Sequence, residues 1–167
     1  MANGDSEVSR LVDQLEREQS GEPWHGQPLG DILSGITHQQ AAVRPLPGGH
    51  TIWEIVLHLT AWKNEVRKRL GGAPAGEPDE GDWPVPPSPP VPDDWRDALA
   101  ALDDAHHALV AVIARMPDSQ LFDRTNDPRV DAESADTYFQ LVEGILQHDI
   151  YHSGQIALLK KAVGRRP

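Results

Sequence analysis

Residues 93–117, DDWRDALAALDDAHHALVAVIARMP, contain a pattern from which the fold class follows. Apolar side chains recur there in alternating steps of four and three residues, which places them on one face of a helix. The members of this stripe are Trp95, Leu99, Leu102, Leu109, Ile113 and Met116, with His106 among them. Such a stripe is typical of a helix in a bundle, because it buries one apolar face against neighbouring helices. The two aspartates at its start suit the positive end of a helix dipole, and Pro117 ends it.

Helical spacing of apolar side chains also appears in four other segments, namely residues 6–18, 28–36 (a short piece), 51–70 and 134–163. The third of these segments opens with a capping box, in which Thr51 is the N-cap and Glu54 follows three residues later. His50, just before this cap, is assigned to the turn that enters the helix. No segment shows the alternation of a strand, so the sequence predicts an all-α protein, a four-helix bundle.

Residues 71–92 contain eight of the fifteen prolines and are therefore predicted to form a long linker without regular structure. A loop of that length is unusual inside a bundle, and it indicates a crossover between helices that are not antiparallel neighbours. We expect one domain over residues 1–167, because the chain is long enough for one hydrophobic core and too short for two.

The composition excludes several classes of function. A formal net charge of -11 argues against binding to nucleic acid and against docking on an anionic membrane surface. The chain has no cysteine, so it has no disulfide, thiolate metal site or thiol nucleophile of its own. No apolar run reaches the roughly 20 residues of a membrane span, and the N-terminus lacks the pattern of a secretion signal. We therefore expect a soluble cytoplasmic protein.

Residues 147–156, QHDIYHSGQI, contain the strongest candidate for chemistry. His148 and His152 are four residues apart, so on a helix their rings project from one face and can meet one ion. Helical metalloproteases use this spacing to bind zinc, although the glutamate base of their motif is absent here. His58 adds to this pair, because it lies in an apolar helix where a buried imidazole needs a partner. Since bundles build metal sites from facing helices, the sequence predicts a divalent metal site on His58, His148 and His152.

Several side chains near this triad allow two interpretations each. Glu54 either completes its helix cap, which we favour, or orients His58 one turn further on. Gln155 either bonds to a metal-bound water or substrate, or is a surface or interhelical amide. His106 is either a core histidine, which we favour, or a fourth metal ligand. Trp83, inside the proline-rich linker, is a candidate for pinning that linker across the mouth of the site.

Two stretches of the chain resemble the DinB-like family of four-helix metalloproteins, which includes YfiT-like proteins regarded as hydrolases and thiol-dependent transferases. These stretches are residues 49–62, GHTIWEIVLHLTAW, and residues 144–159, GILQHDIYHSGQIALL. The family's metal triad has one histidine on the second main helix and two on the last, and these positions match His58, His148 and His152. The resemblance implies a bundle with a long crossover loop, a zinc or nickel ion, and a homodimer.

The resemblance also implies a class of reaction. Some relatives transfer or isomerise groups with a low-molecular-weight thiol such as bacillithiol, mycothiol or glutathione. We therefore expect a metal-dependent enzyme, either a thiol S-transferase or a hydrolase, acting on a small electrophilic substrate. The alternative is a non-catalytic metal-binding or stress-related interaction protein. An open coordination position facing a pocket would favour the enzyme, whereas a fourth protein ligand would favour the structural role.

Overall fold

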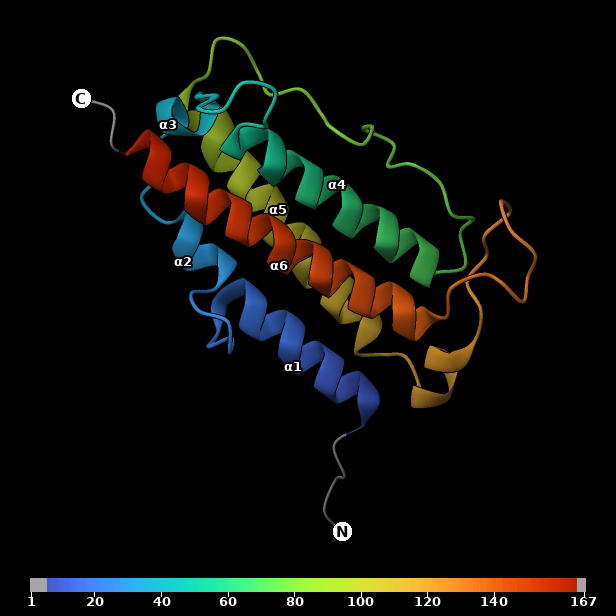
Figure 1. Cartoon of the computed structure of the whole chain (residues 1–167). Coiled ribbons are helices and arrows are strands. Elements are labelled where there is room, and N and C mark those ends of the chain that lie inside the picture. Colours follow the sequence, from blue (N-terminus) through green and yellow to red (C-terminus); the bar gives the residue numbers. More distant parts are fainter. Residues whose placement is uncertain (1–5, 165–167) are drawn as a thin grey trace.

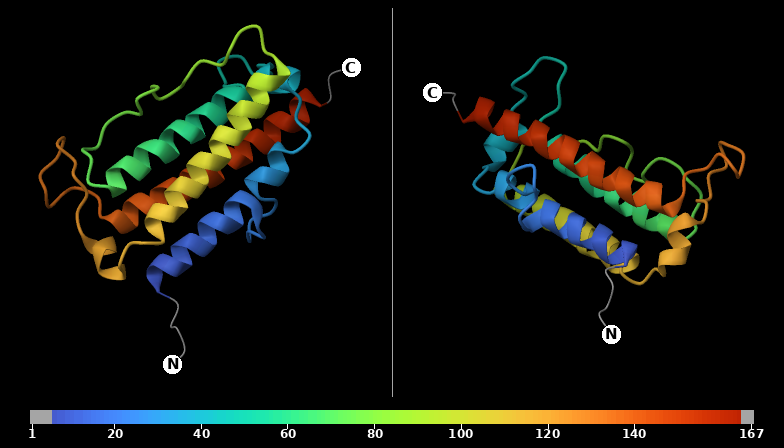
Figure 2. Two further views of the ribbon diagram at one scale, coloured as in Figure 1. Left: turned by 180° about the vertical axis from the view of Figure 1, so that it is seen from behind. Right: turned by 60° about the horizontal axis from the view of Figure 1, so that its bottom comes forward.

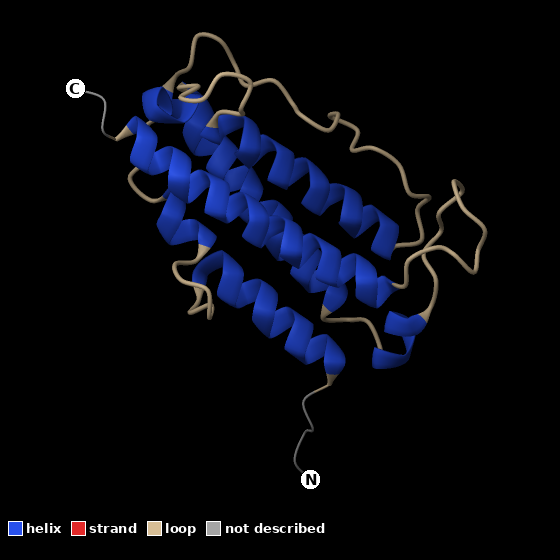
Figure 3. Cartoon of the chain, viewed as in Figure 1, coloured by secondary structure: helices blue, strands red, loops and turns tan. Residues whose placement is uncertain are grey.

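Four long helices pack side by side along their lengths (Figure 1). They are α1 (Glu7–Ser20), α4 (Ile52–Leu70), α5 (Pro92–Ile113) and α6 (Tyr138–Val163). The structure, a computed structural model, describes residues 6–164, and Figure 3 shows only helices and loops within that range. The predicted all-α fold is therefore confirmed. None of the helices in this range is long and apolar enough to cross a lipid bilayer.

The direction of the four helices explains the length of the proline-rich linker. Figure 2 shows that α1 and α6 run one way, whereas α4 and α5 run the other way. Because α4 and α5 are consecutive and parallel, the chain between them has to return along the whole length of the bundle. Residues 71–91 make this return over the outside of α4, and Pro92 then begins α5 in the first-turn position that proline tolerates.

Side-chain caps fix where the helices begin. In α4, Thr51 and Glu54 form the predicted capping box, with both of its hydrogen bonds present. The last helix begins later than predicted, at Tyr138, because Thr137 forms a capping box of its own with Gln140. Ser134, where the sequence predicted the start, lies instead in a turn whose backbone bonds to Asp131.

Three short helical segments complete the chain. The predicted piece at 28–36 is present as α2 (Leu29–Leu33). The apolar pattern did not predict α3 (His38–Ala42), which has a capping box but too few residues to show a period. The short 3-10 helix η1 (Asp118–Phe122) was not predicted either, because it lies in a mostly polar stretch. In Figure 1, α3 lies at the end of the bundle where α4 and α5 begin.

The core of the bundle consists of two apolar clusters with a polar layer between them. One cluster includes Trp53 and Leu102, and the other includes Leu15 and Leu109. Along α4, α5 and α6, buried polar residues separate the members of one cluster from those of the other. This polar layer consists of Glu18, Lys63, His106, Asp149 and Ser153, each at most 5% exposed. It lies at the level of the bundle where α6 carries His148 and His152.

Candidate metal centre

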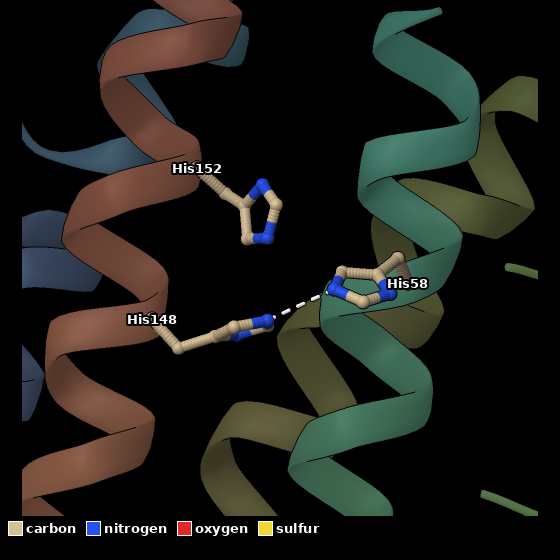
Figure 4. Close-up of side chains that lie close together, drawn as sticks. All are labelled: His58, His148 and His152. Atoms are coloured by element: carbon tan, nitrogen blue, oxygen red, sulfur yellow. Dashed lines mark hydrogen bonds between the residues drawn. The ribbon is translucent and has the colours of Figure 1, made fainter. Parts of the chain in front are cut away.

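The three predicted histidines come together between two antiparallel helices. His58 projects from α4, and His148 and His152 project from successive turns of α6, so that all three rings point into one space (Figure 4). One ligand atom from each residue lies within 4.8 Å of the other two. The Nε2 atoms of His58 and His148 are only 2.9 Å apart.

These distances can be compared with those around a metal ion. Two imidazole nitrogens bound to one ion at about 2.1 Å lie about 3.0 Å apart at a right angle and about 3.4 Å apart at a tetrahedral angle. The 2.9 Å separation of the His58 and His148 Nε2 atoms is close to the first value. The spacing of this pair is therefore compatible with a shared ion.

Hydrogen bonds orient two of the three rings. The Nδ1–H of His58 donates to the backbone carbonyl of Asp82 at 2.5 Å, and the Nδ1–H of His152 donates to Oε1 of Gln155 at 2.7 Å. Because both acceptors are oxygens without a hydrogen, these bonds place the proton on Nδ1 and leave a lone pair on Nε2. Nδ1 of His148 is buried and has no hydrogen-bond partner within residues 6–164. Nε2 of His58 and Nε2 of His152 therefore each have a free lone pair, which a nitrogen needs in order to bind a metal.

The three imidazoles are held in the neutral form. Burial lowers the pKa of His58, of His148 and of His152, because a charged ring loses its hydration there. The effect is largest for His148, whose pKa falls to about 3 through burial and the proximity of the other two rings and of Lys63. Neutral imidazoles keep their lone pairs available at physiological pH, which suits borderline metals such as zinc and nickel.

The proline-rich linker covers one side of the site through Asp82 and Trp83. The Trp83 ring stacks between two histidines. Its ring centre lies 3.9 Å from that of His58 and 3.4 Å from that of His50. The indole of Trp62 donates a hydrogen bond of 2.8 Å to Oδ1 of Asp82. Trp83 therefore lies against the site, as the sequence indicated. The place of His50 was missed, because it depends on a tryptophan from a loop distant in sequence.

A cavity of about 620 Å³ opens beside the three histidines. Its α4 wall is formed by His58, Trp62, Val66 and Arg69, which share one helical face. The other walls come from the linker, from His50 and Asp136, and from α6, including the exposed Tyr151. This volume falls within the range of small-molecule sites.

A sequence model of the DinB superfamily matches residues 25–156, which include the three histidines, the linker and the cavity walls. The chain belongs to the DinB superfamily. No curated protein and no solved structure gives a significant match to this DinB chain. The matched residues thus include all three histidines that converge in the structure.

The DinB structure also gives the contacts of the residues for which two interpretations were open. Glu54 caps α4 and forms an ion pair with Arg44, as favoured. Gln155 orients His152, a role that neither of its two interpretations described. His106 lies in the polar layer, 3.8 Å from the carboxylate of Glu16, with no hydrogen bond to either ring nitrogen within residues 6–164. It does not belong to the cluster of potential ligands, which among the described residues contains the three histidines alone.

Proposed function

We propose that this DinB protein is a metal-dependent enzyme that holds zinc or nickel on His58, His148 and His152. Its substrate would be a small electrophile, and its reaction a thiol S-transfer or a hydrolysis. One observation carries the proposal: three neutral imidazoles converge at the wall of a 620 Å³ cavity, and no fourth side chain from residues 6–164 joins them. Such a site leaves a coordination position for a water or thiol, the pattern of catalytic rather than structural metal sites.

An ion held there would lower the pKa of a bound water or thiol and so supply a nucleophile at neutral pH. The surrounding residues have their own parts in this proposal. Asp82 and Gln155 keep protons on Nδ1 of two ligand rings, so that the opposite nitrogens remain donors. Trp62 and Trp83 shield the site from water and offer apolar surfaces to a substrate. Because the chain has no cysteine, a sulfur nucleophile would come from a low-molecular-weight thiol.

The second candidate is a non-catalytic metal-binding or stress-related interaction protein. It is favoured by the position of the triad, since His58 and His148 join α4 to α6 and an ion there would tie the two helices together. The two candidates differ in what metal removal does: a structural ion is needed for folding, whereas a catalytic ion is needed only for activity. A homodimer remains part of the proposal on family resemblance.

The first test is elemental analysis of the purified protein beside a variant carrying His58→Ala, His148→Ala and His152→Ala. We expect close to one zinc or nickel per chain in the parent and almost none in the triple variant. His107→Ala is the matched control, because His107 is an exposed histidine outside the cluster, and it should retain the metal. A parent that takes up no metal after reconstitution would refute the proposal.

The second test addresses the reaction. The metal-loaded parent is offered a chromogenic aryl halide together with bacillithiol, mycothiol or glutathione in turn, and a chromogenic ester without any thiol. Metal-dependent conjugation with one thiol would establish an S-transferase, and metal-dependent ester cleavage would establish a hydrolase. Full metal occupancy with neither activity would favour the non-catalytic candidate.

A further inference from the structure

The cavity extends beyond the histidines to an arginine near the end of α4. From His58 its α4 wall continues through Trp62 and Val66, both largely apolar, and ends at Arg69. On the facing helix, Gln140 near the start of α6 lines the same end. The cavity therefore has a metal-ligating part, an apolar middle and a polar end that the proposed reaction does not use.

Arg69 is held in place by contacts on three sides. Its Nε donates a hydrogen bond to Oε1 of Glu65 at 2.9 Å, and its Nη2 donates another to the backbone carbonyl oxygen of Gly76. Its guanidinium carbon lies 5.5 Å from the centre of the Trp62 ring, within the range of a cation–π contact. The side chain is only 11% exposed, and Glu65 is buried beside it. Because this side chain is already immobilised, binding a ligand to it costs little further side-chain entropy.

The remaining nitrogen of this guanidinium is free for a ligand. Nη1 makes no hydrogen bond within residues 6–164, although the side chain lines the cavity. Asp136 lines the same end but forms no ion pair with Arg69 in that range, so it does not occupy this nitrogen. A fixed guanidinium with an unused nitrogen can donate a charge-assisted hydrogen bond to a carboxylate oxygen.

We propose that Arg69 forms a carboxylate-binding subsite, and that the ligand of this cavity is a small organic acid. Its carboxylate bonds to Arg69, its apolar part lies along Trp62 and Val66, and its other end reaches the histidines. The last point rests on the proposed function, whereas the subsite does not need the metal. The carboxylate comes either from the electrophile or from the thiol, and the chemistry recognised at Arg69 is the same.

The test is calorimetric titration of the metal-free protein with hydrocinnamate and with hydrocinnamamide, its uncharged amide. We expect the parent to bind the carboxylate at least about tenfold more tightly than the amide. Arg69→Met should abolish this preference. The matched control is Lys161→Met, which removes a positive charge from an exposed residue outside the cavity and should keep the preference. Circular dichroism checks that the variants fold. If Arg69→Met does not fold, the ratio of the parent's affinities for the carboxylate and the amide still tests the proposal.

Two results would overturn the inference. One is a parent that binds the carboxylate no better than the amide, or not at all. The other is a folded Arg69→Met protein that keeps the full preference. Loss of metal with intact carboxylate binding would refute the proposed function alone, and normal metal content without carboxylate preference would refute the subsite alone.

The metal-loaded protein then distinguishes the two sources of the carboxylate. It is titrated with mercaptobutanoate against butanethiol, and with hydrocinnamate against its amide. An Arg69-dependent preference for mercaptobutanoate assigns the carboxylate to the thiol. A preference confined to hydrocinnamate assigns it to the electrophile.

Discussion

The buried ion pair between Lys63 and Asp149 offers a sharp test of how the polar layer is built. Lys63 on α4 is 0% exposed and Asp149 on α6 is 1% exposed, and the ammonium group contacts Oδ2 of the carboxylate. Oδ1 of Asp149 has no hydrogen-bond partner within residues 6–164. Each charge therefore depends on the other, and Asp149→Leu leaves the Lys63 ammonium buried without a counter-ion.

The expected magnitude follows from this burial. Removing one partner of a buried ion pair costs about 3–5 kcal/mol, which is a large part of the roughly 5–15 kcal/mol that stabilises a typical domain. Lys63→Met should cost less than Asp149→Leu, because burial already raises the pKa of the Asp149 carboxyl and the lone acid can take up a proton. In the double variant no charge remains, so its free energy of unfolding should return to within about 1 kcal/mol of the parent or exceed it.

The assay is urea denaturation at neutral pH, followed by far-UV circular dichroism, for the parent, both single variants and the double variant. Lys68→Met is the control, since Lys68 pairs at the surface with Asp79, and Glu65, its neighbour at 3.9 Å, keeps Arg69 as a partner; its free energy of unfolding should stay close to that of the parent. The reasoning fails if Asp149→Leu is as stable as the parent. It also fails if the double variant is no more stable than that single variant, because the loss would then not arise from the unpaired lysine.

Four further predictions concern pH, shielding, metal removal and assembly. Burial and Lys63 hold the pKa of His106 at about 3, so acid favours the unfolded state, and stability falls as the pH drops below the ordinary pKa of about 6.5. Between neutral pH and pH 5, the free energy of unfolding of His106→Leu, measured by urea titration, should therefore fall by about 2 kcal/mol less than that of the parent. The same dependence on pH in both proteins would contradict this. The Trp83→Ala variant should release metal to a chelator several times faster than the parent, with unaltered helix content, because Trp83 covers His58. An equal rate of release would show that the linker does not shield the ion. The metal-free parent should keep its far-UV circular dichroism spectrum, since two apolar clusters hold the bundle, and wholesale unfolding would indicate a structural ion. Sedimentation at micromolar concentration should show a homodimer, and a monomer mass would end that expectation.

The helices with long apolar periods were predictable from the sequence. The stripe from Trp95 and the capping box at Thr51 depend on contacts between residues three or four apart, so the local sequence contains the required information. The start of α6 was misplaced by four residues, because Thr137 caps it and also pairs its backbone with Arg124 in an isolated bridge. The short α3 was missed because five residues are too few to show a period.

The candidate site divides in the same way. That His148 and His152 share a face follows from their spacing, and the apolar context of His58 predicted its burial. What they meet depends on tertiary contacts: the carbonyl of Asp82 on His58 comes from a proline-rich loop without periodicity. The arginine at the end of the cavity had no sequence signal, because any arginine on that helix could have faced water.

The all-α class, the approximate positions of the long helices and the face shared by His148 and His152 could be predicted from local sequence, because they depend on side chains within one or two turns of each other. Three other features could not be predicted: that Lys63 meets Asp149 across 86 residues, that Trp83 lies between His50 and His58, and that the cavity ends in a polar group. These contacts depend on the relative placement of helices and linker. That placement results from the summed packing of both apolar clusters rather than from any local pattern.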